Sequence, residues 1–111
     1  MPEVTVDRRK SPRFALILVA TLKEHGIDVK LAARTSDVSR AGCYVDTLTP
    51  IPKGKSVHLV LTADNETFET TGKVIYTSSG LGMGIQFDQP IDPRQLAILD
   101  RWLEKATELH L

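Results

Sequence analysis

Alternating apolar and polar residues along most of the chain predict β-strands. In the first apolar run, Phe14, Leu16, Leu18, Ala20 and Leu22 form one alternating set, which is the pattern of a strand with one buried face. Further runs follow at 27–34, 42–47, 56–62, 67–77 and 81–87. Turn-forming stretches separate them, including TSDVSRAG at 35–42 and a predicted hairpin turn at Ala63-Asp64-Asn65. We therefore expect six short strands.

The pattern changes after residue 87 to the spacing of a helix. Asp92 before Pro93 is typical of a helix start, with an N-cap followed by proline in the first turn. An apolar stripe with helical spacing follows, made of Leu96, Leu99, Leu103 and Ala106, with Trp102 beside it. Six strands and a helix at about 92–109 predict an all-β fold with one C-terminal helix, a small closed or nearly closed β-barrel. The helix would cap one side of the barrel or dock a partner.

Composition places the chain among ordinary soluble domains. It has 111 residues, 41% hydrophobic and 25% charged, which fits one domain with a real core. The single cysteine, Cys43, excludes an internal disulfide and fits a reducing compartment. The first residues lack a signal-peptide pattern, and no apolar run approaches the ~20 residues of a membrane helix. We expect a cytoplasmic protein.

Positive charge is concentrated near the start of the chain. Lys+Arg and Asp+Glu both number 14, yet DRRKSPR at 7–13 contains Arg8, Arg9, Lys10 and Arg13. Pro12 disfavours a helix here, so residues 1–13 are predicted to be a flexible arm before a barrel at 14–111. Guanidinium groups can fork two hydrogen bonds to a phosphate or a guanine edge. A local cluster on a neutral chain suits a small anionic ligand, although a solvated tail would have the same composition.

A second polar motif, D-x-S-x-x-G, lies at Asp37, Ser39 and Gly42. On an extended segment, Asp37 and Ser39 would point to the same side. A carboxylate can accept hydrogen bonds from a guanine edge or orient an arginine, and glycine permits a sharp turn or close approach to a ligand. Taken alone, the same residues are also typical of a plain Asx turn.

Enzyme and metal signatures are missing from the sequence. His25, His58 and His110 are scattered without metal-ligand spacing, and Cys43 has no partner cysteine. The run GLGMGIQF lacks both the GxGxxG spacing and the following helix of a dinucleotide site, so its glycines are expected to permit a turn and tight packing. We expect neither an enzyme nor a metal site or resident cofactor.

The order of these motifs resembles the PilZ domain family: R-x-x-x-R before the first strand, D-x-S-x-x-G after the second, and a six-strand pattern ending in G-x-G-I-x-F. The resemblance implies a six-stranded antiparallel β-barrel that serves as a bacterial receptor for cyclic di-GMP, with the arginine arm closing over the ligand. It implies that Arg9 and Arg13 contact guanine bases and phosphates. Asp37 and Ser39 would lie on the barrel side of the ligand, and Gly42 would shape the loop.

The resemblance also bears on stoichiometry and output. Arg8, directly before the motif, implies two mutually intercalated cyclic di-GMP molecules per protomer. Tyr76 could present a ring near the bases, or be an ordinary strand residue. The signal would pass to a downstream protein partner that the sequence does not identify. A ligand-independent interaction module stays open as an alternative, whereas zero net charge disfavours a nucleic-acid binder.

Overall fold

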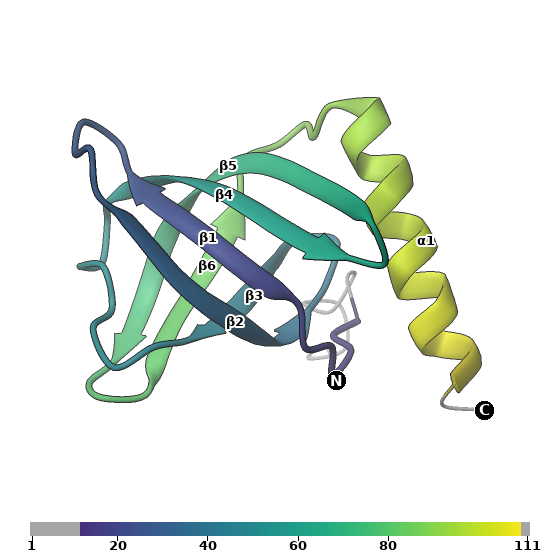
Figure 1. The fold of residues 1–111 in the computed structure, drawn as a ribbon, viewed down its shortest axis with the longest axis horizontal. Helices are drawn as coiled ribbons and strands as arrows, with labels where there is room; N and C mark the ends of the chain where they lie inside the picture. The colour runs from purple at the N-terminus through teal and green to yellow at the C-terminus, as the bar shows by residue number, and fades with distance from the viewer. Residues whose placement is uncertain (1–11, 110–111) are drawn as a thin grey trace, which may run out of the picture.

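Six antiparallel strands form a closed barrel with one helix beside it (Figure 1). The computed structural model describes residues 12–109. Its elements are β1 (Val19–Glu24), β2 (Lys30–Val38), β3 (Gly42–Asp46), β4 (Ser56–Ala63), β5 (Glu66–Ser78), β6 (Gly82–Phe87) and α1 (Pro93–Leu109). The order around the barrel is β1-β2-β3-β6-β5-β4, and β4 pairs with β1 to close it. The predicted fold class is confirmed.

The barrel interior is filled by the inward residues of the alternating runs. On β4, Val57, Leu59 and Leu61 are all buried, as their spacing predicts. Phe68 and Phe87 meet inside the barrel with ring centroids 5.4 Å apart. Because each fully buried large apolar side chain stabilises the fold by roughly 1.5–3 kcal/mol, this alternation is the main source of stability.

The first strand is shorter than its sequence pattern predicts. Leu18, Ala20 and Leu22 are buried as expected, but the paired strand β1 begins only at Val19. Ahead of it, Phe14 makes an isolated antiparallel bridge with Val38 of β2. Residues 15–18 lie between these two paired points and belong to no strand. Apolar alternation thus predicted the buried face of this segment correctly, but it did not predict the residue at which strand pairing begins.

The second strand is displaced toward the C-terminus relative to the prediction. We expected a strand at 27–34 and a turn at 35–42, but β2 runs from Lys30 to Val38 and the turn is confined to the residues after it. Gly26, with φ +86°, ends the preceding turn, and both Ile27 and Val29 are exposed. Pairing with β3 holds the Thr-Ser-Asp stretch extended despite its turn propensity.

The predicted β4–β5 hairpin turn is confirmed at Asp64 and Asn65. Both residues have positive φ, 51° and 66°, which is the conformation required at the two central positions of a type I′ turn. Asn and Asp tolerate this region better than other non-glycine residues. The hairpin brings Ala63 opposite Glu66 and sets the register of the longest strand pair.

Helix α1 packs against the barrel along its predicted apolar stripe. The helix starts as expected, with the backbone N–H of Arg94 donating to Asp92 Oδ1 at 2.8 Å. The buried residues of this face are Leu99, Leu103 and Ala106 of the stripe and Trp102 beside it. The Trp102 ring lies 6.4 Å from that of Phe68, centroid to centroid. The stripe therefore caps the barrel of its own chain and is not free to dock a partner.

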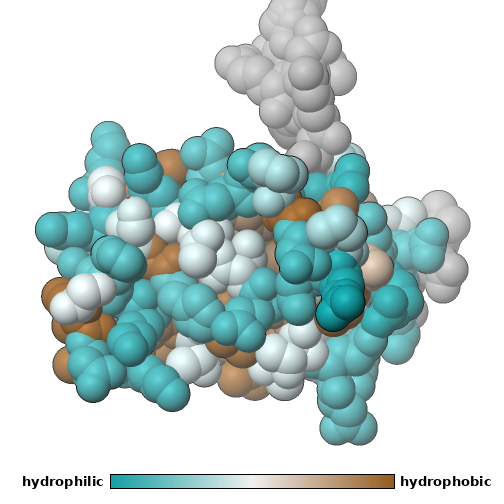
Figure 2. Space-filling view, turned by 90° about the horizontal axis from the view of Figure 1, so that it is seen from above, coloured by the Kyte–Doolittle hydropathy of each residue, from teal (hydrophilic) through white to brown (hydrophobic). Residues whose placement is uncertain are grey.

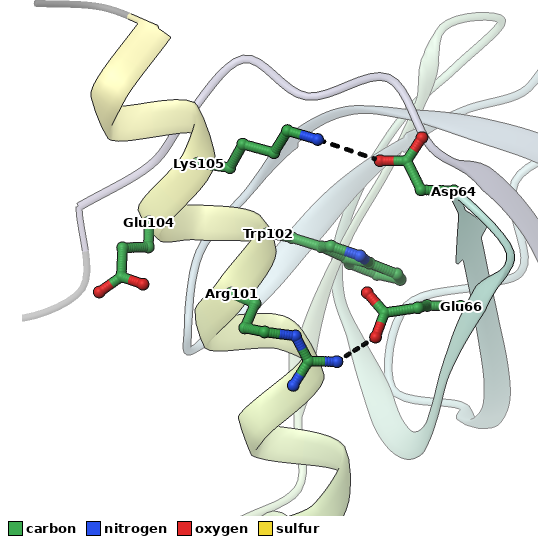
Figure 3. A pocket seen from close by; sticks show the side chains of 6 residues that line it. All are labelled: Asp64, Glu66, Arg101, Trp102, Glu104 and Lys105. Carbon is green, nitrogen blue, oxygen red and sulfur yellow. Dashed lines mark hydrogen bonds and ion pairs between the residues drawn. The ribbon is translucent and has the colours of Figure 1, made fainter.

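Charged residues flank this contact at the β4–β5 hairpin. Figure 3 shows Trp102 reaching from α1 toward the hairpin, with ion pairs to either side. Lys105 Nζ lies 3.6 Å from Asp64 Oδ2, and Arg101 pairs with Glu66. These groups line a hollow of about 330 Å³. Because its cations and two of its carboxylates already pair with one another, we interpret the hollow as part of the helix attachment.

The outer surface is largely polar on the face seen in Figure 2, and hydrophobic residues there form small, separate patches. This is the expected outcome for antiparallel strands that bury one face and solvate the other. Among residues 12–109, the only helix is too short and too polar to cross a membrane.

Candidate ligand-binding site

Two of the predicted site residues, Arg13 and Asp37, lie side by side at the outer surface of the barrel. The bridge between Phe14 and Val38 aligns the two segments, because each backbone N–H donates to the other carbonyl at 2.9 Å. Arg13 Nη1 is then 3.9 Å from Asp37 Oδ2, with side chains 61% and 32% exposed. Arg8 and Arg9 lie outside the described residues, so their predicted roles stay predictions.

A bulge in β2 turns Asp37 outward. Opposite β3, the register shifts between Thr35 and Asp37, so that β2 has one more residue than its partner at this point. Thr35 and Val38 are both fully buried as a result, although uninterrupted alternation would place them on opposite faces. The carboxylate of Asp37 is thereby presented to solvent beside the arginine.

Ser39 occupies a different environment from Asp37. Its side chain is buried, and its Oγ accepts hydrogen bonds from the backbone N–H groups of Ala41 and Gly42 at 3.1 and 3.2 Å. The Ser39 N–H also donates to the Gly42 carbonyl at 2.8 Å. The expectation that Asp37 and Ser39 share one side assumed an extended chain, but the chain turns at Ser39. In this structure the hydroxyl stabilises the turn from β2 to β3.

Gly42 allows β3 to approach β6 closely. A Cβ built at this position would lie 2.0 Å from the Ile85 carbonyl oxygen and 3.0 Å from its carbon. No side chain fits there without moving the backbone of β6. Strand packing in the barrel therefore requires a glycine at position 42, whether or not a ligand is present.

The same turn is connected to the C-terminal helix. Arg40 Nε lies 2.9 Å from Asp100 Oδ1 on α1, and the Ala41 carbonyl accepts a hydrogen bond from the Phe87 N–H at 2.8 Å. A displacement of the turn would therefore affect both the end of β6 and one face of α1.

Two tyrosines, one half-buried and one exposed, extend an outward-facing row that begins at Asp37. Asp37 is opposite Tyr44 on β3, Tyr44 is opposite Gly84 on β6, and Gly84 is opposite Tyr76 on β5. Residues directly opposite each other on paired strands share a face. The two rings have centroids 6.0 Å apart and an interplanar angle of 31°.

The glycines of β6 make room for these rings. A Cβ at Gly84 would come within 2.3 Å of the Tyr76 ring, and one at Gly82 within 2.8 Å of the Tyr44 ring. The prediction that these glycines serve tight packing is confirmed. Tyr44 was missed by sequence reasoning: its outward direction could be read from the buried Cys43 and Val45 on either side, but its neighbour Tyr76 could not be inferred without the strand register.

Cys43 faces the barrel interior behind this surface. Burial raises the pKa of its thiol from 9.0 to about 12, and the nearby Asp37 carboxylate adds to the rise. The thiol is therefore neutral at physiological pH and packs as a small apolar residue. The interpretation of Cys43 as a strand core residue is confirmed.

This outward-facing row combines a cation, a carboxylate and two aromatic rings at the point where the chain enters the barrel. A sequence model of the PilZ domain matches residues 7–105, nearly the whole chain. The chain belongs to the PilZ domain family. No curated protein matches the chain by sequence search.

Solved structures, two of them of PilZ domains, share the fold at low sequence identity. The PilZ domain with c-di-GMP of YcgR from Escherichia coli superposes with a TM-score of 0.74 at 15% identity, covering 93% of this chain and 94% of that one. The PilZ domain of CeSA from a cellulose-synthesizing bacterium gives 0.67 at 17%, covering 91% and 100%. The Bacillus subtilis inhibitor of motility, MotI/DgrA, gives 0.72 at 17%, covering 97% of this chain but only 57% of that longer one.

Proposed function

We propose that this PilZ domain is a non-enzymatic receptor for cyclic di-GMP that orders its N-terminal arginine arm over the ligand. The observation that carries the proposal is the outward-facing row of Arg13, Asp37, Tyr44 and Tyr76. Two comparisons support the proposal: the chain matches the PilZ family, and it shares its fold with a PilZ domain that was solved with c-di-GMP.

The charges of the row suit a dianionic guanine dinucleotide. Arg13 can fork hydrogen bonds to a phosphate or to guanine O6 and N7, and the Asp37 carboxylate can accept from guanine N1–H and N2–H₂. Their mutual contact is long, 3.9 Å, and exposed. Exposed ion pairs of this kind contribute about 0–1 kcal/mol, so the ligand can replace the contact at little cost. Asp37 holds Arg13 near the site without blocking it.

The two tyrosines offer a surface for stacking. Stacking of a nucleobase on an aromatic ring contributes roughly 1–3 kcal/mol per base. Tyr44 and Tyr76 lie on neighbouring positions of the same face as Asp37. When Asp37 binds the edge of one guanine, the second guanine of the dinucleotide is within reach of a tyrosine ring on which it can stack.

Binding then depends on several contacts forming together. Ordering the arm opposes binding by roughly 1–2 kcal/mol per fixed residue, whereas each hydrogen bond to a charged group contributes about 1.5–3 kcal/mol. One arginine contact cannot order the arm from Arg8 to Arg13, but several phosphate and guanine contacts can. The ordered arm changes the surface that the protein presents, and that change is the proposed signal to a downstream partner.

Isothermal titration calorimetry with cyclic di-GMP tests the proposal. We expect two ligands per chain for the wild type, because Arg8 adds a planar cation next to the motif; a fit to one ligand per chain would remove the two-ligand proposal. Arg9→Ala and Arg13→Ala should each abolish measurable binding. Arg34→Ala is the matched control, since Arg34 on β2 is similarly exposed and its Nε lies 3.8 Å from Asp46 Oδ2 on β3.

Cyclic di-AMP is the matched ligand control. It has the same charge and backbone, so equal binding of both dinucleotides would contradict base recognition by Asp37. Retained affinity after both Arg9→Ala and Arg13→Ala would show that the arm is not the site. If the wild type shows no thermal shift with cyclic di-GMP, the receptor proposal fails in favour of a ligand-independent interaction module.

A further inference from the structure

The chain between the arm and β1 follows an irregular path. Phe14 pairs with Val38, and Val19 pairs with Arg34. Four residues, 15–18, therefore lie between these points on the arm side, and only three, 35–37, lie between them on β2. A regular antiparallel ladder needs equal numbers on both sides. The backbone at 15–18 is consequently out of register with β2, and its N–H and C=O groups need other partners.

The hydroxyl of Thr35 supplies two of these partners. Its Oγ1 accepts a hydrogen bond from the Leu18 N–H at 2.9 Å and donates to the Leu16 carbonyl at 2.7 Å. The Thr35 N–H also donates to the Leu18 carbonyl at 3.0 Å. Thr35 is fully buried, so these bonds are shielded from competing water. One hydroxyl thus closes the gap that the unequal spacing leaves.

Thr35 also stands at the bulge that turns Asp37 outward. The same short stretch of β2 therefore determines where the N-terminal arm leaves the barrel and where the Asp37 carboxylate meets that arm. The bridge from Phe14 to Val38 follows directly after the segment that Thr35 holds. Arg13 is the next residue along the chain, and its guanidinium meets Asp37.

We propose that Thr35 is a positioning residue for the ligand site: through its paired hydrogen bonds to Leu16 and Leu18, it anchors the root of the N-terminal arm so that Arg13 is held at Asp37. This inference rests on the proposed cyclic di-GMP function and deepens it. Thr35 does not touch the ligand. It acts by keeping residues 14–18 ordered before the ligand arrives, so that binding has to order only the arm beyond them.

This pair of hydrogen bonds requires a side-chain atom that accepts one hydrogen bond and donates another. Valine has nearly the shape of threonine but neither function, so Thr35→Val leaves the Leu18 N–H and the Leu16 carbonyl without partners in a buried place. We expect these groups to turn toward water, which frees the root of the arm. Serine keeps the hydroxyl, and cysteine offers only a weak donor and acceptor. Thr35→Val isolates the loss of the hydroxyl at nearly constant shape, whereas serine and cysteine both lack the methyl group and compare oxygen with sulfur at similar volume.

The test measures the Kd for cyclic di-GMP by titration calorimetry in Thr35→Val, Thr35→Ser and Thr35→Cys, at a temperature where each variant is folded. Thr35→Val is expected to weaken binding about tenfold, the equivalent of ordering one additional residue. Thr35→Ser should return the Kd to within about twofold of the wild type, and Thr35→Cys should fall between them. If Thr35→Val does not fold, the cysteine and serine variants still order the series.

A core control separates positioning from general stability. Val57→Ala removes buried volume on β4, at the opposite end of the barrel from Phe14, and should lower the melting temperature without changing the Kd. If Val57→Ala and Thr35→Val weaken binding alike for a similar loss of melting temperature, Thr35 has only a structural role and the proposal is overturned. A wild-type Kd in Thr35→Val would overturn it equally.

Amide hydrogen exchange tests the anchor without any ligand. The N–H groups of Phe14, Leu18 and Val38 are all hydrogen-bonded in the structure. In Thr35→Val, the Phe14 and Leu18 amides should lose protection while amides within β4 and β5 keep theirs; unchanged protection at Phe14 contradicts the proposal. Should the wild type fail to bind cyclic di-GMP, the proposed function falls, and this exchange experiment alone decides whether Thr35 anchors the arm.

Discussion

The glycine of the D-x-S-x-x-G motif provides a sharp test of how the barrel is built. Gly42→Ala adds a single Cβ, which would lie 2.0 Å from the Ile85 carbonyl oxygen and 3.2 Å from the Gln86 Cα. Ordinary contacts of this kind exceed about 3.4 Å. All of the nearest atoms belong to the backbone of β6, so no side-chain rotation can relieve the overlap. The ends of β3 and β6 have to move apart by roughly 1 Å or more.

The expected loss of stability follows from the bonds at this end of the strand pair. Separation strains the Phe87 N–H to Ala41 carbonyl bond at 2.8 Å and the turn in which the Ser39 N–H donates to the Gly42 carbonyl at 2.8 Å. Each such bond contributes roughly 0.5–1.5 kcal/mol net, and an unpaired buried group costs about 1–3 kcal/mol. We therefore expect Gly42→Ala to lower the free energy of unfolding by about 2–4 kcal/mol, a large part of the ~5–15 kcal/mol of a typical domain.

Two other glycines are controls at which an added Cβ meets less resistance than at Gly42. Gly80 has φ +72° and no atom within 4 Å of its built Cβ, so Gly80→Ala carries only the conformational cost, about 1–2 kcal/mol. At Gly84 the nearest atoms belong to the Tyr76 ring, at 2.3 Å. Because that ring can turn away, Gly84→Ala should displace the tyrosine and cost less than Gly42→Ala.

Urea unfolding, followed by the fluorescence of Trp102, measures all three variants. Trp102 is the single tryptophan and is buried at the helix contact, so its emission reports loss of the fold. A Gly42→Ala stability within 0.5 kcal/mol of the wild type, or a larger loss for Gly80→Ala, would refute the backbone-contact explanation. Loss of ligand binding in Gly42→Ala is informative only where the variant is shown to be folded.

Two further predictions concern Cys43 and Asp92. Burial raises the pKa of the Cys43 thiol from 9.0 to about 12, so the unfolded chain releases this proton at a lower pH than the folded chain does. The buried thiol therefore contributes its full stability below about pH 9. That contribution is lost as the pH rises toward 12, by up to ~1.4 kcal/mol per pH unit. Urea unfolding at pH 8 and pH 10.5 should show a larger drop for the wild type than for Cys43→Ala, and equal drops would contradict the shift. Asp92→Ala removes the hydrogen bond to the Arg94 N–H at 2.8 Å and should lower the free energy of unfolding by about 1 kcal/mol, whereas Asp92→Ser, which keeps a capping oxygen, should lose less than half of that.

The sequence by itself determined the elements whose signals are local. The β4 alternation, the hairpin turn at Asp64 and Asn65, and the Asp92 cap each depend on residues within a few positions of one another. Backbone conformation and periodicity therefore predicted them correctly. The order of the arginine, aspartate and glycine motifs along these elements was enough to indicate the family before any fold was known.

Tertiary structure alone decided which of the motif residues face one another. The stretch from Thr35 to Val38 reads locally as a turn, but pairing with β3 and Phe14 makes it a bulged strand. A bulge shifts every later side chain to the opposite face, and so it exposes Asp37. No local pattern contains that information, because it depends on partners far away in the sequence.

The same reason explains the contacts that sequence reasoning missed. Tyr44 and Tyr76 are 32 positions apart in the chain, yet both lie beside Gly84 because β6 runs between their strands. Thr35 meets Leu16 and Leu18, which lie 19 and 17 positions before it in the chain. Their contacts arise from strand register and barrel closure, which are properties of the whole chain. The sequence determined which strands form, and barrel closure decided which side chains meet across them.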